Sequence, residues 1–495
     1  MLIIISLLIS VSSFSQKWNW IKSDFTQKMP DQYMACDDNN GVYLCYDDLL
    51  IKYDTSGVLQ WQLTLGTLTV SAMEGTKDGV VISGNYLGVL SFGQFSISQG
   101  PQDQMIILYF DGKGKLQWHY SPTGPGRAFC EDLTVDLNEN IAFTGYCSDS
   151  LEFSGYSVTK SNYIFAQIDK QGVLKQLHAA QAVKALGKKV RSDSLGNYYV
   201  FGECGQSTTF NPTLTINGGT LGTTFILLKY DQSFNLIWGQ NLGTSFKLSS
   251  GKMNKDRGTK HTYLTLISNY SCNVYRYDEY GTLRDSFSPG IANYSFWISR
   301  ILTNSNDVYF MGYLSFEGKF CSYTIPEGMY LLSQSVDKNC QWVVNATGPQ
   351  GAIPYGLAVK GENIYTSGWY GKQLLIADTV YTSPDTTRTY ATYAGKLSVP
   401  RKTTDLIEQK NNPVSLQFPN PVLSNEITIS LKSSASCSKH KIELFDTFGQ
   451  IVANGFLDNQ TCSCTIVLNN VNPGTYYLRC SDSQETTFKK ILILK

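Results

Sequence analysis

The sequence predicts an all-β protein: a β-propeller of about seven four-stranded blades, followed by a small C-terminal β-sandwich. Aromatic residues make up 13% of the 495 residues and charged residues only 16%, a balance typical of folded, exported β-proteins rather than disordered chains. Two short units alternate through residues 16–400, and such self-similarity indicates repeated blades. Residues 415–495 change to short alternating strands separated by Pro and Gly turns, which predicts a separate sandwich.

The first residues predict a signal peptide at 1–15. Residues 2–11 are almost wholly apolar, and small residues follow up to a cut after Ser15, as expected of an exported chain. The apolar stretch is too short to span a bilayer, and no later run of eighteen apolar residues occurs, so we expect no transmembrane segment. The segment departs from the usual pattern because no Lys or Arg precedes Lys17.

The first repeated unit is a strand, an Asp, a short turn and a Trp-bearing strand. It runs from residues 51–54 to Trp61, from 108–111 to Trp118 and from 228–231 to Trp238. Four weaker copies bring the number to seven: Asp169, Asp278, Asp337 with Trp342, and residues 396–398. The mean spacing is about 57 residues, longer than a typical propeller blade.

The second unit is a polar turn followed by a strand that ends in Gly or Ser. Examples are Asp78-Gly79 before residues 80–84, Asn140 before 141–145, and Asn306-Asp307 before 308–312. Together the two units give about four strands per period, the content of one blade. Five periods carry an additional middle piece, such as residues 90–93 leading to 105–108, and the first and fifth lack it. These pieces resemble the bacterial β-propeller repeat of secreted Bacteroidetes proteins, with seven blades expected and six or eight as alternatives.

The ends of the repeat predict how the ring closes. The last period stops at Ser398 without a Trp strand, whereas residues 17–21 form a Trp strand that no period claims. We therefore expect the N-terminal strand to complete the last blade and leave no open sheet edge.

Several recurrent residues have structural explanations. The repeated Asp before each turn is expected to cap that turn through its own backbone, and the Trp residues are expected to pack between blades. The four His residues show neither metal-ligand nor triad spacing, so we expect no metal, no cofactor and no catalytic residues. If Asn40-Gly41 forms a two-residue turn, Cys36 and Cys45 face each other and pair as a disulfide.

Two features suggest ligand contacts. Forty basic and forty acidic residues give a net charge of zero, which argues against nucleic acid as a partner. Two basic segments, residues 184–191 and 247–260, would suit an anionic glycan, although solvated loops explain them too. Aromatic residues follow the strand-ending Gly in several periods: Tyr86, Tyr146, Tyr313, Trp369 and Tyr370. Their rings would stack on a sugar or a peptide. The alternative is that they are only a structural part of the repeat.

The C-terminal segment resembles the type A C-terminal sorting domain of the type IX secretion system of Bacteroidetes. The resemblance rests on residues 418–421, 442–446, 449–450, 473–478 and 488–491, whereas four cysteines depart from the usual pattern: Cys437, Cys462, Cys464 and Cys480. It implies the secretion machinery as a partner, removal of the domain, and attachment to surface lipopolysaccharide or release. The residues that carry the sorting signal would be Pro419, Asn420, Pro421, Asp446, Gly449, Gly474, Tyr476, Lys489 and Lys490.

The predicted organisation is therefore a signal peptide at 1–15, a propeller at 16–400, a linker at 401–414 and a sorting domain at 415–495. The first functional hypothesis is a secreted or outer-membrane-attached protein whose propeller is a non-enzymatic binding or adhesion module for an extracellular glycan or protein. The alternatives are a secreted glycan lyase or hydrolase of propeller type and a structural component of a surface layer, because fold does not decide function.

Overall fold

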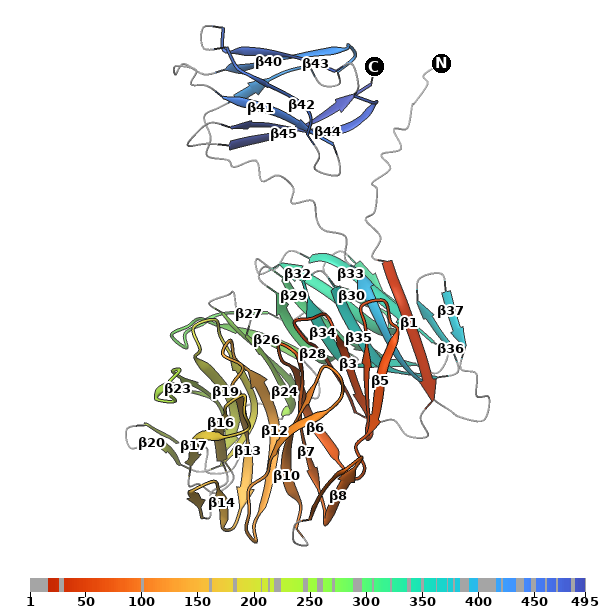
Figure 1. Cartoon of the computed structure of the whole chain (residues 1–495). Helices are drawn as coiled ribbons and strands as arrows, with labels where there is room; N and C mark the ends of the chain where they lie inside the picture. Colours follow the sequence, from red (N-terminus) through yellow and green to blue (C-terminus); the bar gives the residue numbers. More distant parts are fainter. Residues whose placement is uncertain are drawn as a thin grey trace. The chain divides into compact units, whose positions relative to one another are not determined.

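The computed structural model describes residues 17–25, 31–98, 102–159, 163–180, 185–205, 207–211, 214–217, 224–243, 248–255, 261–268, 272–287, 296–304, 307–320, 323–335, 340–348, 351–361, 363–371, 373–376, 379–382, 391–398, 415–419, 422–432, 440–446, 451–458, 461–468, 471–481 and 486–494. The chain divides into two compact units, Met1–Pro400 and Arg401–Lys495. All regular structure in the described residues is β-strand (Figure 1). The predicted signal peptide and linker lie outside the described residues.

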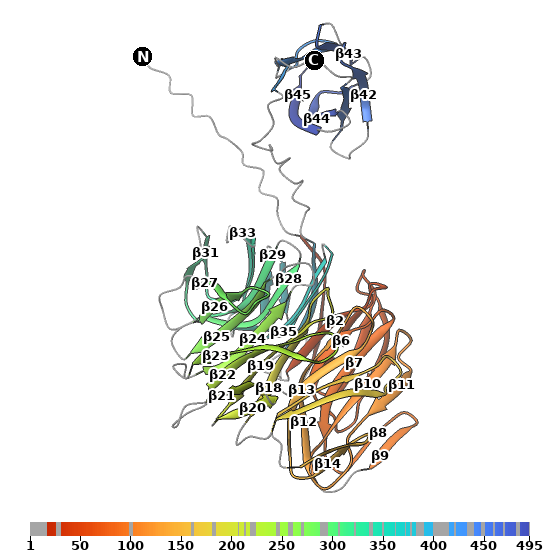
Figure 2. The ribbon, with the colours of Figure 1, turned by 90° about the vertical axis from the view of Figure 1, so that its left-hand side faces the viewer.

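The first unit contains seven antiparallel four-stranded blades in the described residues, so the all-β propeller prediction is confirmed. Figure 2 shows the blades following one another in sequence order. The first strands of the blades, which contact one another in order around the ring, are β2 (Gln32–Cys36), β6 (Thr69–Gly75), β12 (Arg127–Val135), β18 (Leu186–Ser192), β24 (Leu248–Lys255), β28 (Phe296–Asn304) and β34 (Ala352–Lys360).

The other strands of each blade follow outward in the same order. The second strands are β3 (Val42–Tyr46), β7 (Gly79–Tyr86), β13 (Ile141–Ser148), β19 (Tyr198–Cys204), β25 (Thr262–Ser268), β29 (Asp307–Leu314) and β35 (Asn363–Tyr370). The third strands are β4 (Leu49–Tyr53), β10 (Gln104–Asp111), β16 (Tyr163–Ile168), β22 (Thr224–Tyr230), β26 (Cys272–Tyr277), β32 (Gly328–Ser335) and β38 (Ala391–Ser398). The outer strands are β5 (Leu59–Thr64), β11 (Leu116–Tyr120), β17 (Leu174–Ala180), β23 (Leu236–Gly243), β27 (Leu283–Phe287), β33 (Cys340–Thr347) and β1 (Lys17–Phe25).

The additional middle pieces form hairpins between the second and third strands. In the described residues they occur in blades 2, 3, 4, 6 and 7, and not in blades 1 and 5, as the repeat predicts. The last hairpin also pairs with β33 of blade 6. The five hairpins are β8 (Val89–Phe92) with β9 (Phe95–Ser98), β14 (Leu151–Phe153) with β15 (Tyr156–Val158), β20 (Thr208–Asn211) with β21 (Leu214–Ile216), β30 (Gly318–Phe320) with β31 (Tyr323–Ile325), and β36 (Gln373–Ile376) with β37 (Thr379–Thr382).

The N-terminal strand closes the ring, as predicted. Strand β1 pairs antiparallel with β38, from Lys17 opposite Ser398 to Phe25 opposite Ala391. Blade 7 therefore combines three strands from the end of the repeat with one from its beginning. This pairing covers the outer edge of β38, which would otherwise present unpaired backbone groups.

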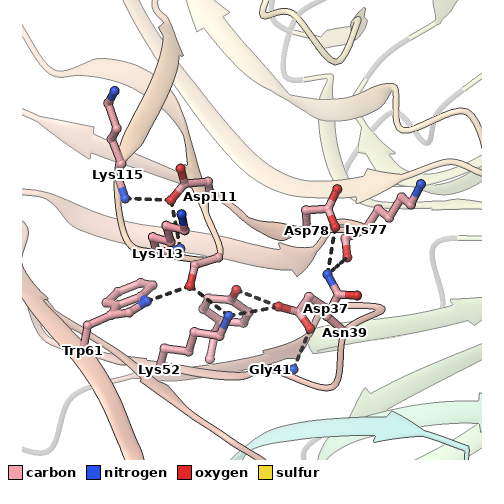
Figure 3. A network of polar contacts seen from close by, with 12 residues as sticks. Asp37, Asn39, Gly41, Lys52, Trp61, Lys77, Asp78, Asp111, Lys113 and Lys115 are labelled. Carbon is pink, nitrogen blue, oxygen red and sulfur yellow. Dashed lines mark hydrogen bonds and ion pairs between the residues drawn. The ribbon is translucent and has the colours of Figure 1, made fainter.

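Tryptophans on the outer strands hold neighbouring blades together. The indole N–H of Trp61 donates to the carbonyl of Gly112 in the next blade at 3.0 Å, and Lys52, opposite Trp61 in the sheet, donates to the same oxygen at 2.9 Å (Figure 3). Trp238 and Lys229 share the carbonyl of Glu279 in the same way. We call this arrangement the seam clamp.

The closing seam uses the same clamp. Trp20 of β1 and Lys396 of β38 both donate to the carbonyl of Thr55 in blade 1, at 3.0 and 3.2 Å. A Cβ built on Gly57, whose φ is +80°, would lie 2.7 Å from Cδ2 of Trp20. Only glycine therefore lets the turn meet the indole this closely.

The repeated aspartates cap the turns, as predicted. In blade 1 the Oδ1 atom of Asp54 accepts hydrogen bonds from the backbone N–H groups of Ser56 and Val58, both at 2.9 Å. The same pair of bonds, to the second and fourth residues beyond, recurs at Asp111, Asp136, Asp169, Asp193, Asp231 and Asp278. These bonds satisfy turn N–H groups that no strand pairs.

The predicted Cys36–Cys45 disulfide is wrong, because the turn before β3 is longer than two residues. The Asp37 carboxylate accepts from the Gly41 N–H, and the register places Cys36 opposite Val42 and Cys45 opposite Tyr33. The two cysteines are thus three positions apart along the ladder, roughly 10 Å, beyond disulfide reach. Both thiols are free, whereas Cys340 and Cys462 are disulfide-bonded.

The second unit is the predicted β-sandwich. One sheet has the order β39 (Ser415–Gln417), β40 (Glu426–Lys432), β43 (Ser463–Val467), and the other has the order β42 (Ile451–Phe456), β41 (Lys441–Phe445), β44 (Gly474–Ser481), β45 (Thr486–Ile493). Alternate residues of both sheets fill one core, which includes Ile427, Ile429, Ile442, Leu444, Leu478 and Ile491. This packing of two inner faces is the usual core of a sandwich.

Candidate binding site in the central channel

The first strands of the blades share one irregularity. The register shifts at the same place in β6, β12, β18, β24, β28 and β34, as in a β-bulge. A bulge changes the direction of the next side chain and often lies beside a functional site. The residues that follow the shift differ between blades: Ala72, Asp132, Lys189, Ser250, Arg300 and Gly356.

Four of these post-bulge residues line a cavity at the centre of the ring. The cavity holds about 100 Å³ and is bounded by Ala72, Asp132, Lys189 and Arg300, together with Tyr33 of blade 1. A second compartment of about 290 Å³ has five lining residues in common with the first: Met34, Glu74, Arg191, Leu302 and Leu357. The two compartments therefore form one channel, which we call the axial channel. We call the first, smaller compartment the inner compartment and the second the outer compartment.

Asp132 is fully engaged by the protein. Its carboxylate accepts hydrogen bonds from Nη1 of Arg191 at 2.6 Å and from the N–H of Val190 at 3.0 Å, and Nζ of Lys189 lies 3.5 Å away. Burial alone raises the pKa of the Asp132 carboxyl, but the positive charges of Arg191 and Lys189 and the Val190 bond bring that pKa below its ordinary value. Asp132 is therefore a buried anion held charged by two cations.

Arg300 is less completely paired. Its guanidinium donates to the carbonyls of Ser299 at 3.1 Å and Gln32 at 3.5 Å, and no described carboxylate lies within ion-pair distance of it. Burial lowers the pKa of Arg300, and burial together with the nearby Arg191 and Arg300 charges lowers the pKa of Lys189 despite Asp132. The channel thus gathers three cations around Asp132, with a second carboxylate, Glu74, also in the lining.

The rest of the lining is a phenol, an acid and apolar side chains. Burial raises the pKa of Tyr33, so its hydroxyl stays protonated and can donate a hydrogen bond. Glu74 lies in both compartments, and Met34, Leu302 and Leu357 supply apolar walls. Within the described residues, no group of three or more His, Cys, Asp or Glu side chains is placed to hold a metal ion. The arrangement suits binding of an anionic group beside apolar surface.

The aromatic residues suggested as ligand contacts lie at the ends of second strands but do not form one surface. Tyr86 is 2% exposed, Trp369 7% and Tyr370 0%, and the Tyr370 hydroxyl hydrogen-bonds Ser23. These three rings are core residues and are not available for stacking. Tyr146 stacks on Phe129 in blade 3 with ring centroids 4.8 Å apart, whereas Tyr313 lies in blade 6.

One of the two basic segments does reach the site. Lys189 and Arg191 of the first segment lie in the axial channel, whereas the side chains of the second segment lie outside the described residues. Sequence reasoning missed Asp132 and Arg300. Arg300 is the only charged residue of β28, a signal that could have found it. Asp132 shares β12 with Arg127 and Glu131 and carries no such signal.

The comparisons with known proteins identify the second unit. Residues 417–494 match the family model of the secretion system C-terminal sorting domain. This unit is a type IX sorting domain. The protein is therefore secreted or attached to the cell surface, and its sorting domain interacts with the type IX secretion machinery. In the described residues, no helix is long and apolar enough to cross a membrane.

The sorting residues named from sequence lie on several elements of this domain. Gly474 begins β44, Tyr476 is 8% exposed and donates from its hydroxyl to the Asn472 carbonyl at 2.8 Å, and Lys489 lies in β45. Pro419 precedes β40 and Asp446 follows β41. Asn420, Pro421 and Gly449 lie outside the described residues, as does the side chain of Lys490.

Solved structures resemble the chain in fold only. A protein of unknown function from Bacteroides caccae is 9% identical, with a TM-score of 0.33, and the match covers 53% of this chain and 83% of that one. The Dos1 propeller is 9% identical with a TM-score of 0.41 over 78% and 96% of the two chains. A protein of unknown function from Dyadobacter fermentans is 9% identical with a TM-score of 0.38 over 78% and 99%. No curated protein matches the chain.

Proposed function

We propose that the exported propeller is a non-enzymatic binding module that recognises an extracellular glycan or protein at the axial channel. The observation that carries this proposal is the channel itself, where Lys189 and Arg191 of blade 4 converge with Arg300 of blade 6. A partly buried cation without a carboxylate partner, such as Arg300, reduces stability, so a protein retains it most readily where a ligand completes the pairing.

The sorting domain determines where this binding occurs. On this proposal the secretion machinery carries the chain across the outer membrane, the sorting domain is removed, and the propeller is attached to surface lipopolysaccharide or released. A ring closed by its own N-terminal strand suits that environment, because radial repetition leaves only short edge strands.

An array of glycans and peptides, probed with the full chain, tests the proposal. We expect saturable binding to a subset of spots, and mass spectrometry of those spots should find the ligand intact. A cleaved ligand would indicate that the propeller is a lyase or hydrolase rather than a binding module. No binding on any spot would favour a structural role in a surface layer.

A further inference from the structure

We propose that the inner compartment of the axial channel binds the carboxylate of an acidic ligand, with Arg300 as its main contact. This proposal rests on the proposed function and specifies the chemical class of ligand. The shared chemistry is a carboxylate on a small sugar acid or at the end of an acidic glycan.

The protein already shows how this layer holds a carboxylate. Asp132 and Arg300 occupy the same post-bulge position on β12 and β28, and both line the inner compartment. Asp132 is bound by an arginine, a lysine and a backbone N–H. Arg300 has the complementary charge, but its contacts are two carbonyl oxygens, which leaves donors of its five N–H groups for a ligand.

The geometry favours a carboxylate over a neutral group. An arginine fork binds a planar carboxylate through two parallel hydrogen bonds, stronger than neutral hydrogen bonds. Tyr33, on the wall of the same compartment, supplies a protonated hydroxyl as a further donor. The inner compartment, at about 100 Å³, fits the acidic end of a ligand, and the outer compartment, at about 290 Å³, receives the remainder.

The charges that face Arg300 set the strength of the site. Lys189 and Arg191 repel Arg300 and attract a ligand, whereas the carboxylates of Asp31, Asp132 and Glu74 oppose an incoming anion. Because Lys189 and Arg191 are already engaged by Asp132, Arg300 carries the net attraction. Binding should therefore weaken with ionic strength but not vanish, since the site is partly shielded from solvent.

Calorimetric titration of the full chain with D-galacturonate tests this inference, with D-galactose as the neutral match. We expect binding of galacturonate and none of galactose. Arg300→Gln should weaken binding at least about tenfold, in line with loss of charge-assisted hydrogen bonds. Lys113→Gln is the matched control, because Lys113 is an exposed cation in a turn of blade 2, and it should leave the affinity unchanged.

A second variant protects the test against misfolding. Arg300→Lys keeps the charge but loses the planar fork of hydrogen-bond donors. This variant should fold and should bind galacturonate, with an affinity several times lower than that of the wild type. Equal affinity of wild type and both Arg300 variants, or no binding of galacturonate, would overturn the inference. Sulfate that competes as strongly as galacturonate would also overturn it, because the site would then be a general anion site.

Two further arms identify the source and separate the two proposals. Tighter binding of an oligogalacturonate than of the monomer would indicate a glycan end, and equal binding would indicate a free sugar acid. Array binding that Arg300→Gln leaves intact would retain the proposed function and reject the carboxylate site. Galacturonate binding that depends on Arg300, together with no binding on the array, would retain the carboxylate site and reject the proposed function.

Discussion

The lysines at the blade seams and Arg300 of the axial channel differ in the contacts that the protein gives them. Lys52, Lys229 and Lys396 each donate to a turn carbonyl of the next blade that also accepts from a tryptophan. Each also lies over a tyrosine ring, with Nζ between 5.0 and 5.9 Å from its centroid. Arg300 in the channel contacts two carbonyls and, among the described residues, no carboxylate.

This difference separates structure from function. The seam clamp recurs with the same residue types and contacts, including at the closing seam, so it is explained by the need to hold blades together. The post-bulge position recurs in geometry but not in residue type, since it holds Ala72, Asp132, Lys189 and Arg300 in different blades. Stability needs the repeated residues, and the varied ones are the candidates for ligand contact.

The largest expected effect comes from removing the N-terminal strand. A chain that begins at residue 26 lacks β1, with Trp20 and its bond to Thr55. We expect the free energy of unfolding to fall by about 5 kcal/mol or more, because the shortened chain loses two partly buried tryptophans, Trp18 and Trp20, together with the pairing of β1 with β38. Chemical denaturation of the two chains measures it. Equal midpoints would mean that the closing seam carries no stability.

The closing and internal seams should respond alike to loss of their tryptophans. Trp20→Ala and Trp61→Ala each remove a half-buried indole and its bond to a turn carbonyl, so each should lower the free energy of unfolding by about 3 kcal/mol. Leu59→Ala, at a side chain that is 50% exposed, is the control, with little expected change. A Trp20 effect far below the Trp61 effect would show that β1 is only loosely held.

The turn glycines give a smaller and more specific effect. Gly57→Ala and Gly114→Ala place a Cβ 2.7 and 2.9 Å from an indole ring at positive φ, so each should lower the free energy of unfolding by about 2 kcal/mol. Gly88, at φ +72°, has no atom within 4 Å of a built Cβ. Gly88→Ala therefore measures the backbone strain alone, at about 1 kcal/mol. If all three variants lost the same unfolding free energy, the close contact with the indole ring would not explain the loss.

The repeat made most of the fold predictable from sequence. The Asp turns, the Trp strands and the unmatched strand at residues 17–21 predicted seven blades and their closure, because each signal recurs and acts through local chemistry. The turn before Val42 was mispredicted, since Asn-Gly favours a two-residue turn while the Asp37 carboxylate stabilises a longer one. That single turn moved Cys36 away from Cys45.

The site was less predictable for two physical reasons. Which side chains face the axis depends on the register shifts in the first strands, and no local pattern marks them. The aromatic residues after the strand-ending glycines were predicted to contact a ligand because they recur. Tyr86, Trp369 and Tyr370 recur because they are core residues. Lys189 and Arg191 were visible as a charged segment, whereas Asp132 and Arg300 are brought to them only by the ring.

The most direct test measures stability and galacturonate binding on the same two variants. Lys52→Met leaves the buried Asp37 carboxylate, 3.3 Å from Nζ, without its cation, so we predict about 2 kcal/mol less unfolding free energy and unchanged affinity. Arg300→Met removes an incompletely paired cation, so we predict unchanged or slightly higher stability, up to about 1 kcal/mol, and at least about tenfold weaker binding. An Arg300→Met chain that loses as much stability as Lys52→Met and binds galacturonate normally would contradict the account.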